Sequence, residues 1–175
     1  MKSCPDTHRG ETREDAVRLA AQLEAEGVVP LLGYSKESSD SLTEIQNTEA
    51  EIVLCIEAEK SLKKPTFVAI KLSGLSPEQE LRQLERDIQE LVSVNSASVD
   101  QAAFLSKTRA LLLTRYPDFF NRLKHMTETA EKCNVQLVLD AEIRFHGEVD
   151  SLPASAVLCW LLNSGKNCMW NTHQM

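Results

Sequence analysis

The feature that most constrains the fold of this chain is the alternation of short apolar runs with helical segments. Three runs are rich in β-branched and aliphatic residues: VVPLLGY (28–34), TFVAIKL (66–72) and VQLVL (135–139). The segments between them carry apolar residues at helical spacing. Strands that alternate with helices are joined by crossover connections. The pattern therefore predicts three parallel strands, near residues 28–33, 66–72 and 135–139.

The helical segments carry their own start and stop signals. Gly27 and Asn134 follow two of them, and both residue types suit a left-handed helix end. The expected starts are the capping box Ser41-Leu-Thr-Glu44, the pair Ser76-Pro77 and the pair Pro117-Asp118. In the helix expected near 101–115, the predicted core residues are Ala103, Leu105, Leu111 and Leu112.

Composition bounds the class of protein. A chain of 175 residues is one domain or part of a larger one, and 42% hydrophobic with 26% charged residues is typical of a globular protein. The formal net charge of −7 argues against binding to nucleic acid or to an anionic membrane. None of the five cysteines has metal-site spacing, so we expect reduced, structural thiols, an intracellular compartment and no metal.

The pattern weakens towards the carboxyl end of the chain. Residues 146–175 are poor in charge and hold both tryptophans; within them, 156–162 could be a buried helix or strand, and the last 13 residues are expected to be loop. Three parallel strands do not close a sheet. We therefore expect an incomplete α/β domain over residues 1–145, followed by a divergent tail.

Polar residues stand where the strands end, and ligands of parallel α/β proteins bind at the carboxyl ends of strands. A lysine within a covered strand needs a partner, so Lys71 and Asp140 are expected to pair. Each residue also has an ordinary explanation. Lys71 could reach outward to water, Asp140 could cap the next segment, Glu142 could be a solvated loop carboxylate, and Tyr34 could be a packing residue.

The strand-end residues form a recognisable pattern. FVAIKLSGL (67–75) resembles the lysine strand of FAD-dependent proline dehydrogenases, in which an apolar run leads into K-[LVF]-[ST]-[AG]-L. VQLVLDAE (135–142) resembles the same family's V-x-L-x-[IVL]-D-A-E strand. FNRLKHMTETAEKCN (120–134) is similar to the helix before that strand, and residues 8–37 are similar to the family's opening. The segments follow the family's order over roughly residues 8–145.

This resemblance implies a fold and an activity. The family fold is a distorted (β/α)8 barrel with FAD at the carboxyl ends of its strands, and the activity is oxidation of L-proline to 1-pyrroline-5-carboxylate, with electrons passing on to a quinone. Lys71 and Asp140 would line the substrate pocket, while Tyr34, Ala141 and Glu142, together with Asp140, would contact the flavin. Eukaryotic members are associated with the mitochondrial inner membrane, although no targeting segment is visible in this sequence.

Departures from the family pattern qualify that expectation. After the Asp-Ala-Glu sequence this chain continues Ile143-Arg144-Phe145 in place of an aromatic and Q-P segment, and the late helix with paired substrate-binding arginines is not found. We therefore expect a truncated sequence that is inactive alone. Two alternatives stay open: a non-catalytic form that associates with full-length subunits, and another (β/α) barrel fragment whose Lys71 forms a Schiff base. The sequence leaves the oligomeric state open.

Overall fold

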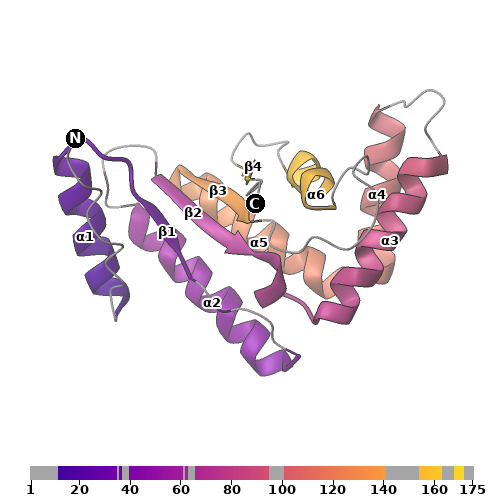
Figure 1. Ribbon diagram of the computed structural model, residues 1–175, viewed down its shortest axis with the longest axis horizontal. Coiled ribbons are helices and arrows are strands. Elements are labelled where there is room, and N and C mark those ends of the chain that lie inside the picture. The colour runs from indigo at the N-terminus through magenta and orange to yellow at the C-terminus, as the bar shows by residue number, and fades with distance from the viewer. Residues whose placement is uncertain are drawn as a thin grey trace, which may run out of the picture.

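The computed structural model describes residues 12–34, 36, 40–60, 62, 66–94, 101–140, 154–162 and 168–171. Over these residues, helices and strands alternate along most of the chain (Figure 1). The elements in chain order are α1 (Arg13–Ala25), β1 (Leu31–Gly33), α2 (Leu42–Glu59), β2 (Thr66–Lys71), the 3₁₀ turn η1 (Leu72–Gly74), α3 (Glu78–Val94), α4 (Gln101–Arg115), α5 (Pro117–Cys133), β3 (Val135–Asp140), α6 (Ala154–Leu162) and β4 (Cys168–Asn171).

The strands form one parallel sheet in the order β1-β2-β3-β4. The three strands that the sequence predicts are confirmed, with the first shorter than expected. The prediction of loop at the end of the chain is wrong for β4, which pairs with β3 from Leu137↔Cys168 to Asp140↔Asn171. A four-residue strand is too short to show a clear pattern, so its pairing with β3 reveals it. Residues 156–162, left open as helix or strand, belong to α6.

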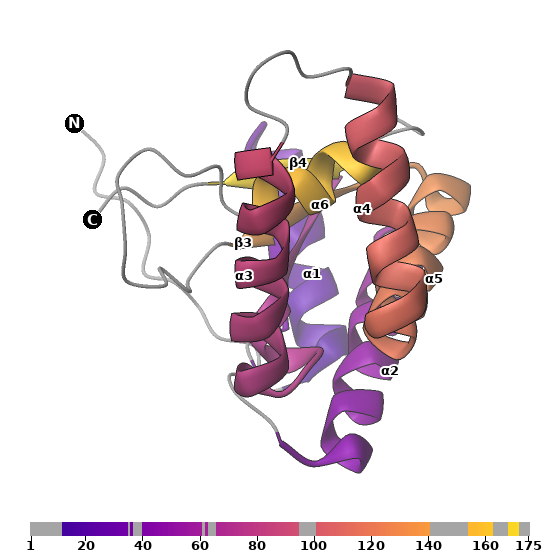
Figure 2. The ribbon, with the colours of Figure 1, turned by 90° about the vertical axis from the view of Figure 1, so that its right-hand side faces the viewer.

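The two faces of the sheet have different environments. Along β2, Thr66, Val68 and Ile70 are buried, whereas Phe67, Ala69 and Lys71 are half-buried. Helices α2 and α5 pack against each other and against β2 and β3, and Figure 2 shows them on one side of the strands. One face of β2 therefore packs on helices, whereas its other face is only partly covered among the described residues.

The helices bury apolar stripes against that covered face. On α5 the buried stripe includes Phe119, Leu123, Met126 and Ala130, which recur at helical spacing. On α4 the prediction needs correction. Ala103 is exposed, and the buried residues are Phe104, Thr108 and Leu112, which recur every four positions. Leu112 is confirmed as a core residue, and Leu105 and Leu111 pack against the core while partly buried. The prediction is wrong for Ala103 and missed Phe104 and Thr108, whose hydroxyl donates to the Phe104 carbonyl over 3.0 Å.

The predicted helix ends are largely confirmed. Asn134 adopts φ 56° after α5, and Gly27 adopts φ 85° after α1, as left-handed termini require. Ser41 occupies the N-cap position of α2, but its side chain does not make the cap hydrogen bond that the capping box predicts. Glu44 instead pairs with Lys36, with 3.0 Å between Nζ and Oε1. The capping box therefore predicts where α2 begins but not the contacts of its Glu44.

The turn that follows Lys71 approaches another segment closely. A Cβ added at Gly74 would lie 2.8 Å from the Lys36 carbonyl oxygen and 3.1 Å from Thr48 Cγ2. The Lys36 oxygen belongs to the backbone and cannot rotate away. Gly74 is therefore required by contact between the segments that follow β1 and β2. Gly33 differs, because a Cβ there would meet only Ala69 Cβ, at an ordinary 3.5 Å.

These two glycines give a matched pair of substitutions. Gly74→Ala is expected to lower the free energy of unfolding by about 1–3 kcal/mol, the usual cost of overpacking. Gly33→Ala is expected to be neutral or slightly stabilising, because it restricts the unfolded chain without a clash. Urea unfolding followed by circular dichroism measures both. Equal midpoints for the two variants would contradict the close approach at Gly74.

Candidate functional site at the carboxyl ends of the strands

Lys71 and Asp140 end two neighbouring parallel strands and are register partners. Register partners on adjacent strands project to the same face of a sheet. The same register pairs Ala69 with Val138 and Phe67 with Gln136 on that face. Both Lys71 and Asp140 are half-buried. The structure thus brings together the two residues that the sequence singles out, and the ion pair between them stays a prediction.

The carboxylate of Asp140 is incompletely satisfied. Its Oδ1 atom is buried and has no hydrogen-bond partner within the part of the chain that the structure describes. Leaving a buried acceptor without a partner costs about 1–3 kcal/mol, and more for a charged group. Unsatisfied buried groups are rare in native proteins and often mark a site that a ligand or water completes. Asp140 is therefore the strongest indication of a binding function at this end of the sheet.

The backbone after Lys71 is held in place from α5. Ser73 and Gly74 in η1 are buried, and Arg122 donates from Nε to the Leu75 carbonyl over 3.0 Å. Arg122 thereby satisfies a backbone acceptor just beyond the turn. Because α5 leads directly into β3, this contact ties the turn after β2 to the helix that precedes the strand of Asp140. The strand-end site is positioned by tertiary contacts as well as by strand pairing.

The remaining predicted residues are placed differently. Tyr34 directly follows β1, is half-buried and packs against the apolar core, as expected for a packing residue. Its predicted contact with a cofactor stays a prediction. Ala141 and Glu142 lie outside the described residues. The candidate site therefore consists of Lys71, Asp140 and the face of the sheet below them.

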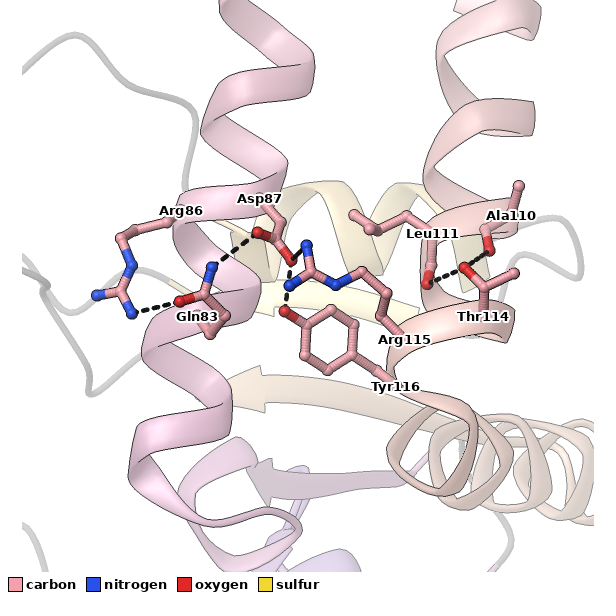
Figure 3. Close-up of polar contacts among 8 residues, drawn as sticks. All are labelled: Gln83, Arg86, Asp87, Ala110, Leu111, Thr114, Arg115 and Tyr116. Atoms are coloured by element: carbon pink, nitrogen blue, oxygen red, sulfur yellow. Dashed lines mark hydrogen bonds and ion pairs between the residues drawn. The ribbon is translucent and has the colours of Figure 1, made fainter.

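A second polar cluster, which the sequence did not indicate, lies between α3 and the junction of α4 with α5 (Figure 3). Asp87 is only 7% exposed and accepts hydrogen bonds from the Tyr116 hydroxyl at 2.5 Å and from Gln83 Nε2 at 2.9 Å. Arg115 Nη1 lies 2.7 Å from the same carboxylate. Arg86 completes the cluster by donating to Gln83 Oε1 at 2.6 Å.

This cluster is internally satisfied, so its geometry favours a structural role. Both oxygens of Asp87 have partners, and burial together with the bond to Asp87 raises the pKa of the Tyr116 hydroxyl above its usual range. Tyr116 therefore stays protonated and donates its hydrogen. The only hint in the sequence is an acidic residue beside the apolar stripe of α3, with Arg115 and Tyr116 just before a helix-starting proline.

A further buried carboxylate lies at the end of α2. Glu59 is 1% exposed, and neither Oε atom has a well-formed hydrogen bond within the described ranges. Burial raises the pKa of Glu59, the nearby Thr66 hydroxyl lowers it, and the negative charge of Glu24 raises it further. Thr66 begins β2, so Glu59 lies at the opposite end of that strand from Lys71. It is therefore separate from the candidate site.

Other titratable residues offer no alternative centre. His125 is exposed on α5, and its Nδ1 lies 2.9 Å from Glu49 Oε1 on α2. Cys55 and Cys133 are free, half-buried thiols. Within the described ranges, no three His, Cys, Asp or Glu side chains are grouped to bind a metal. No described helix combines the length and apolar character needed to cross a membrane.

Comparison with known proteins adds no assignment. No family model matches the chain, and no curated protein matches it significantly. A function is therefore inferred from the geometry at the carboxyl ends of β2 and β3 and from the sequence motifs that meet at these strand ends.

The Asp87 cluster predicts energetic coupling across the helices. Tyr116→Phe keeps the ring but removes the donor, and Asp87→Ala removes the acceptor. Each is expected to lower the free energy of unfolding, and a double-mutant cycle is expected to give a coupling of about 1.5–3 kcal/mol, typical of a hydrogen bond to a charged group. Chemical unfolding of the four proteins measures it. Additive effects would show that the bond contributes little.

Glu59 predicts a dependence of stability on pH. Its folded-state pKa is raised above the usual 4.5, so the folded protein retains the proton to higher pH than the unfolded chain. The associated stability is present below pH 4.5 and is lost as pH rises through the folded pKa. Glu59→Gln mimics the protonated group. It is expected to raise Tm at pH 8 and to leave Tm nearly unchanged at pH 4.

A nearby exposed residue provides the control for this measurement. Glu57→Gln removes an exposed carboxylate from the same helix and is expected to leave Tm unchanged at both pH values. A Glu59→Gln effect of the same size at pH 4 and pH 8 would contradict a raised pKa, because only the charged form is penalised by burial.

Proposed function

We propose that the carboxyl ends of β2 and β3 form part of the substrate site of a proline dehydrogenase-like (β/α)8 barrel. The observation that carries this proposal is the register pair Lys71↔Asp140, with its buried, unsatisfied Asp140 oxygen. These two residues end the segments FVAIK and VQLVLD, which carry the resemblance to the family. Motifs 69 positions apart in the sequence therefore meet at the place where a parallel α/β protein binds its ligand.

The available groups suit a small amino acid. L-Proline carries a secondary amine and a carboxylate. The unsatisfied Asp140 Oδ1 accepts a hydrogen bond from the amine, and the positive charge of Lys71 balances the carboxylates gathered at this end. The two side chains orient and polarise the substrate. A bound FAD would supply the redox chemistry by accepting hydride from proline.

The open face of the sheet fits the substrate side of such a site. Below Lys71 and Asp140 it carries Phe67, Ala69 and Val138, which offer an apolar floor. On the same resemblance we propose that the product is 1-pyrroline-5-carboxylate, that a quinone accepts the electrons and that the protein is located at the mitochondrial inner membrane. Tyr34, Ala141 and Glu142 remain the proposed flavin contacts.

The test follows L-proline binding by amide chemical shifts. Titration with L-proline is expected to shift residues 71–74 and residue 140, at the ends of β2 and β3. Asp140→Asn is expected to weaken binding by about tenfold, because it removes the charge that attracts the amine. Asp118→Asn, at an exposed position that starts α5, is the control and is expected to leave binding unchanged.

Two results would contradict the proposal: shifts that avoid the strand ends, or binding that Asp140→Asn leaves intact. The purified chain is also expected to show no flavin absorbance and no proline-dependent dye reduction. Among the described residues, Phe67 and Ala69 below Lys71 stay partly exposed, so water reaches the position where a flavin would need enclosure. Dye reduction that Lys71→Ala abolishes would instead show that this chain is a working enzyme.

A further inference from the structure

The sheet exposes apolar residues along one edge and one face. Leu31 in β1 is 55% exposed, and Val28 and Val29 just before it are 48% and 50% exposed. Phe67 and Ala69 in β2 face the same side as Leu31 by register and are only half-buried. Among the described strands, β1 pairs only with β2, and β4 only with β3. An exposed edge next to an apolar face is a site where another chain can pair.

We propose that a second copy of this chain covers this face, so that two four-stranded sheets close into one eight-stranded parallel barrel. All four strands are parallel and follow one another in chain order, so the free edges, β1 and β4, have the same direction and lie at opposite sides of the sheet. A twofold axis along the barrel then places β4 of each copy beside β1 of its partner. Eight strands are the number that closes such a barrel around packed side chains.

The distribution of helices agrees with this arrangement. In Figure 2, α2, α4 and α5 lie on the right of the view and α3 stands apart from them on the left; α2 and α5 pack directly on β2 and β3. A barrel has its helices outside, so α2 and α5 already lie on the side of the sheet that closure would leave outermost. Phe67 and Ala69, which are half-buried, would join the already buried Val138 as interior residues. Two copies of the Lys71 and Asp140 pair would gather at one mouth with balanced charge.

A second copy explains both edges at once. A twofold interface is self-complementary, and it uses β1 and β4 equally in each copy. A ligand on the face would leave both edges unpaired. A single strand added from elsewhere would satisfy only one edge. The dimer rests on the barrel geometry of the proposed function but not on its flavin chemistry. A chain that does not bind L-proline would therefore still be expected to form the dimer.

Sedimentation of the full chain at increasing concentrations tests the association. A closed dimer of about 39 kDa, twice the 19.6 kDa chain, is expected, with no larger species because closure leaves no free edge. Leu31→Asp places a charge on the β1 edge and is expected to weaken dimerisation at least about tenfold. Leu113→Asp is the matched control: Leu113 is 51% exposed on α4, and its replacement is expected to preserve the dimer.

Hydrogen exchange distinguishes barrel closure from other dimers. Closure is expected to protect the amides of residues 31–33 and 168–171 together as concentration rises, since β1 and β4 pair across the interface. Far-ultraviolet circular dichroism checks that both variants fold. Any one of four results would overturn the proposal. These are a monomer at all concentrations, growth into larger oligomers, equal sensitivity of dimerisation to the two substitutions, and protection of one edge strand alone.

Discussion

The pairing of β2 with β3 is the constraint on which the rest of the structure depends. Six consecutive register partners, from Thr66↔Val135 to Lys71↔Asp140, fix how the two longest strands align. Because side chains alternate between faces, this register decides which residues enter the core and which face outward. A shift by one residue would bury Lys71 and expose Ile70. The hydrophobic pattern of β2 therefore fixes the position of Lys71 beside Asp140.

Three carboxylates with buried oxygens differ in how far their hydrogen-bonding capacity is met. Asp87 contacts Tyr116, Gln83 and Arg115, so it joins α3 to α4 and to the N-cap residue of α5, and both of its oxygens have partners. Asp140 and Glu59 each retain buried oxygens without partners among the described residues. Glu59 lies where strands begin, and Asp140 lies where they end. Only the latter location coincides with the ligand-binding end of parallel sheets.

The sequence predicted local features better than contacts between distant residues. The β2 and β3 strands follow from their apolar runs, and the left-handed Asn134 follows from its place after a helix. The neighbouring positions of Lys71 and Asp140 were predictable because the ends of parallel strands meet at one edge. The bond from Tyr116 to Asp87 was not, because it joins residues 29 positions apart on different elements and depends on helix packing. Strand β4 was missed because it is short and depends on its pairing with β3.

The long connection between β2 and β3 has a consequence for how the chain folds. Thr66 and Val135 are adjacent in the sheet but 69 positions apart in sequence, with α3, α4 and α5 between them. Closing a loop of that length has an entropic cost that must be met before the strand pairing can offset it. Arg122 reaches Leu75 across 47 positions, and Tyr116 reaches Asp87 across 29. Docking of the helices through these shorter connections would bring the two strands together. We therefore expect the central strand pair to form late in folding, at a rate that depends on contacts outside the sheet.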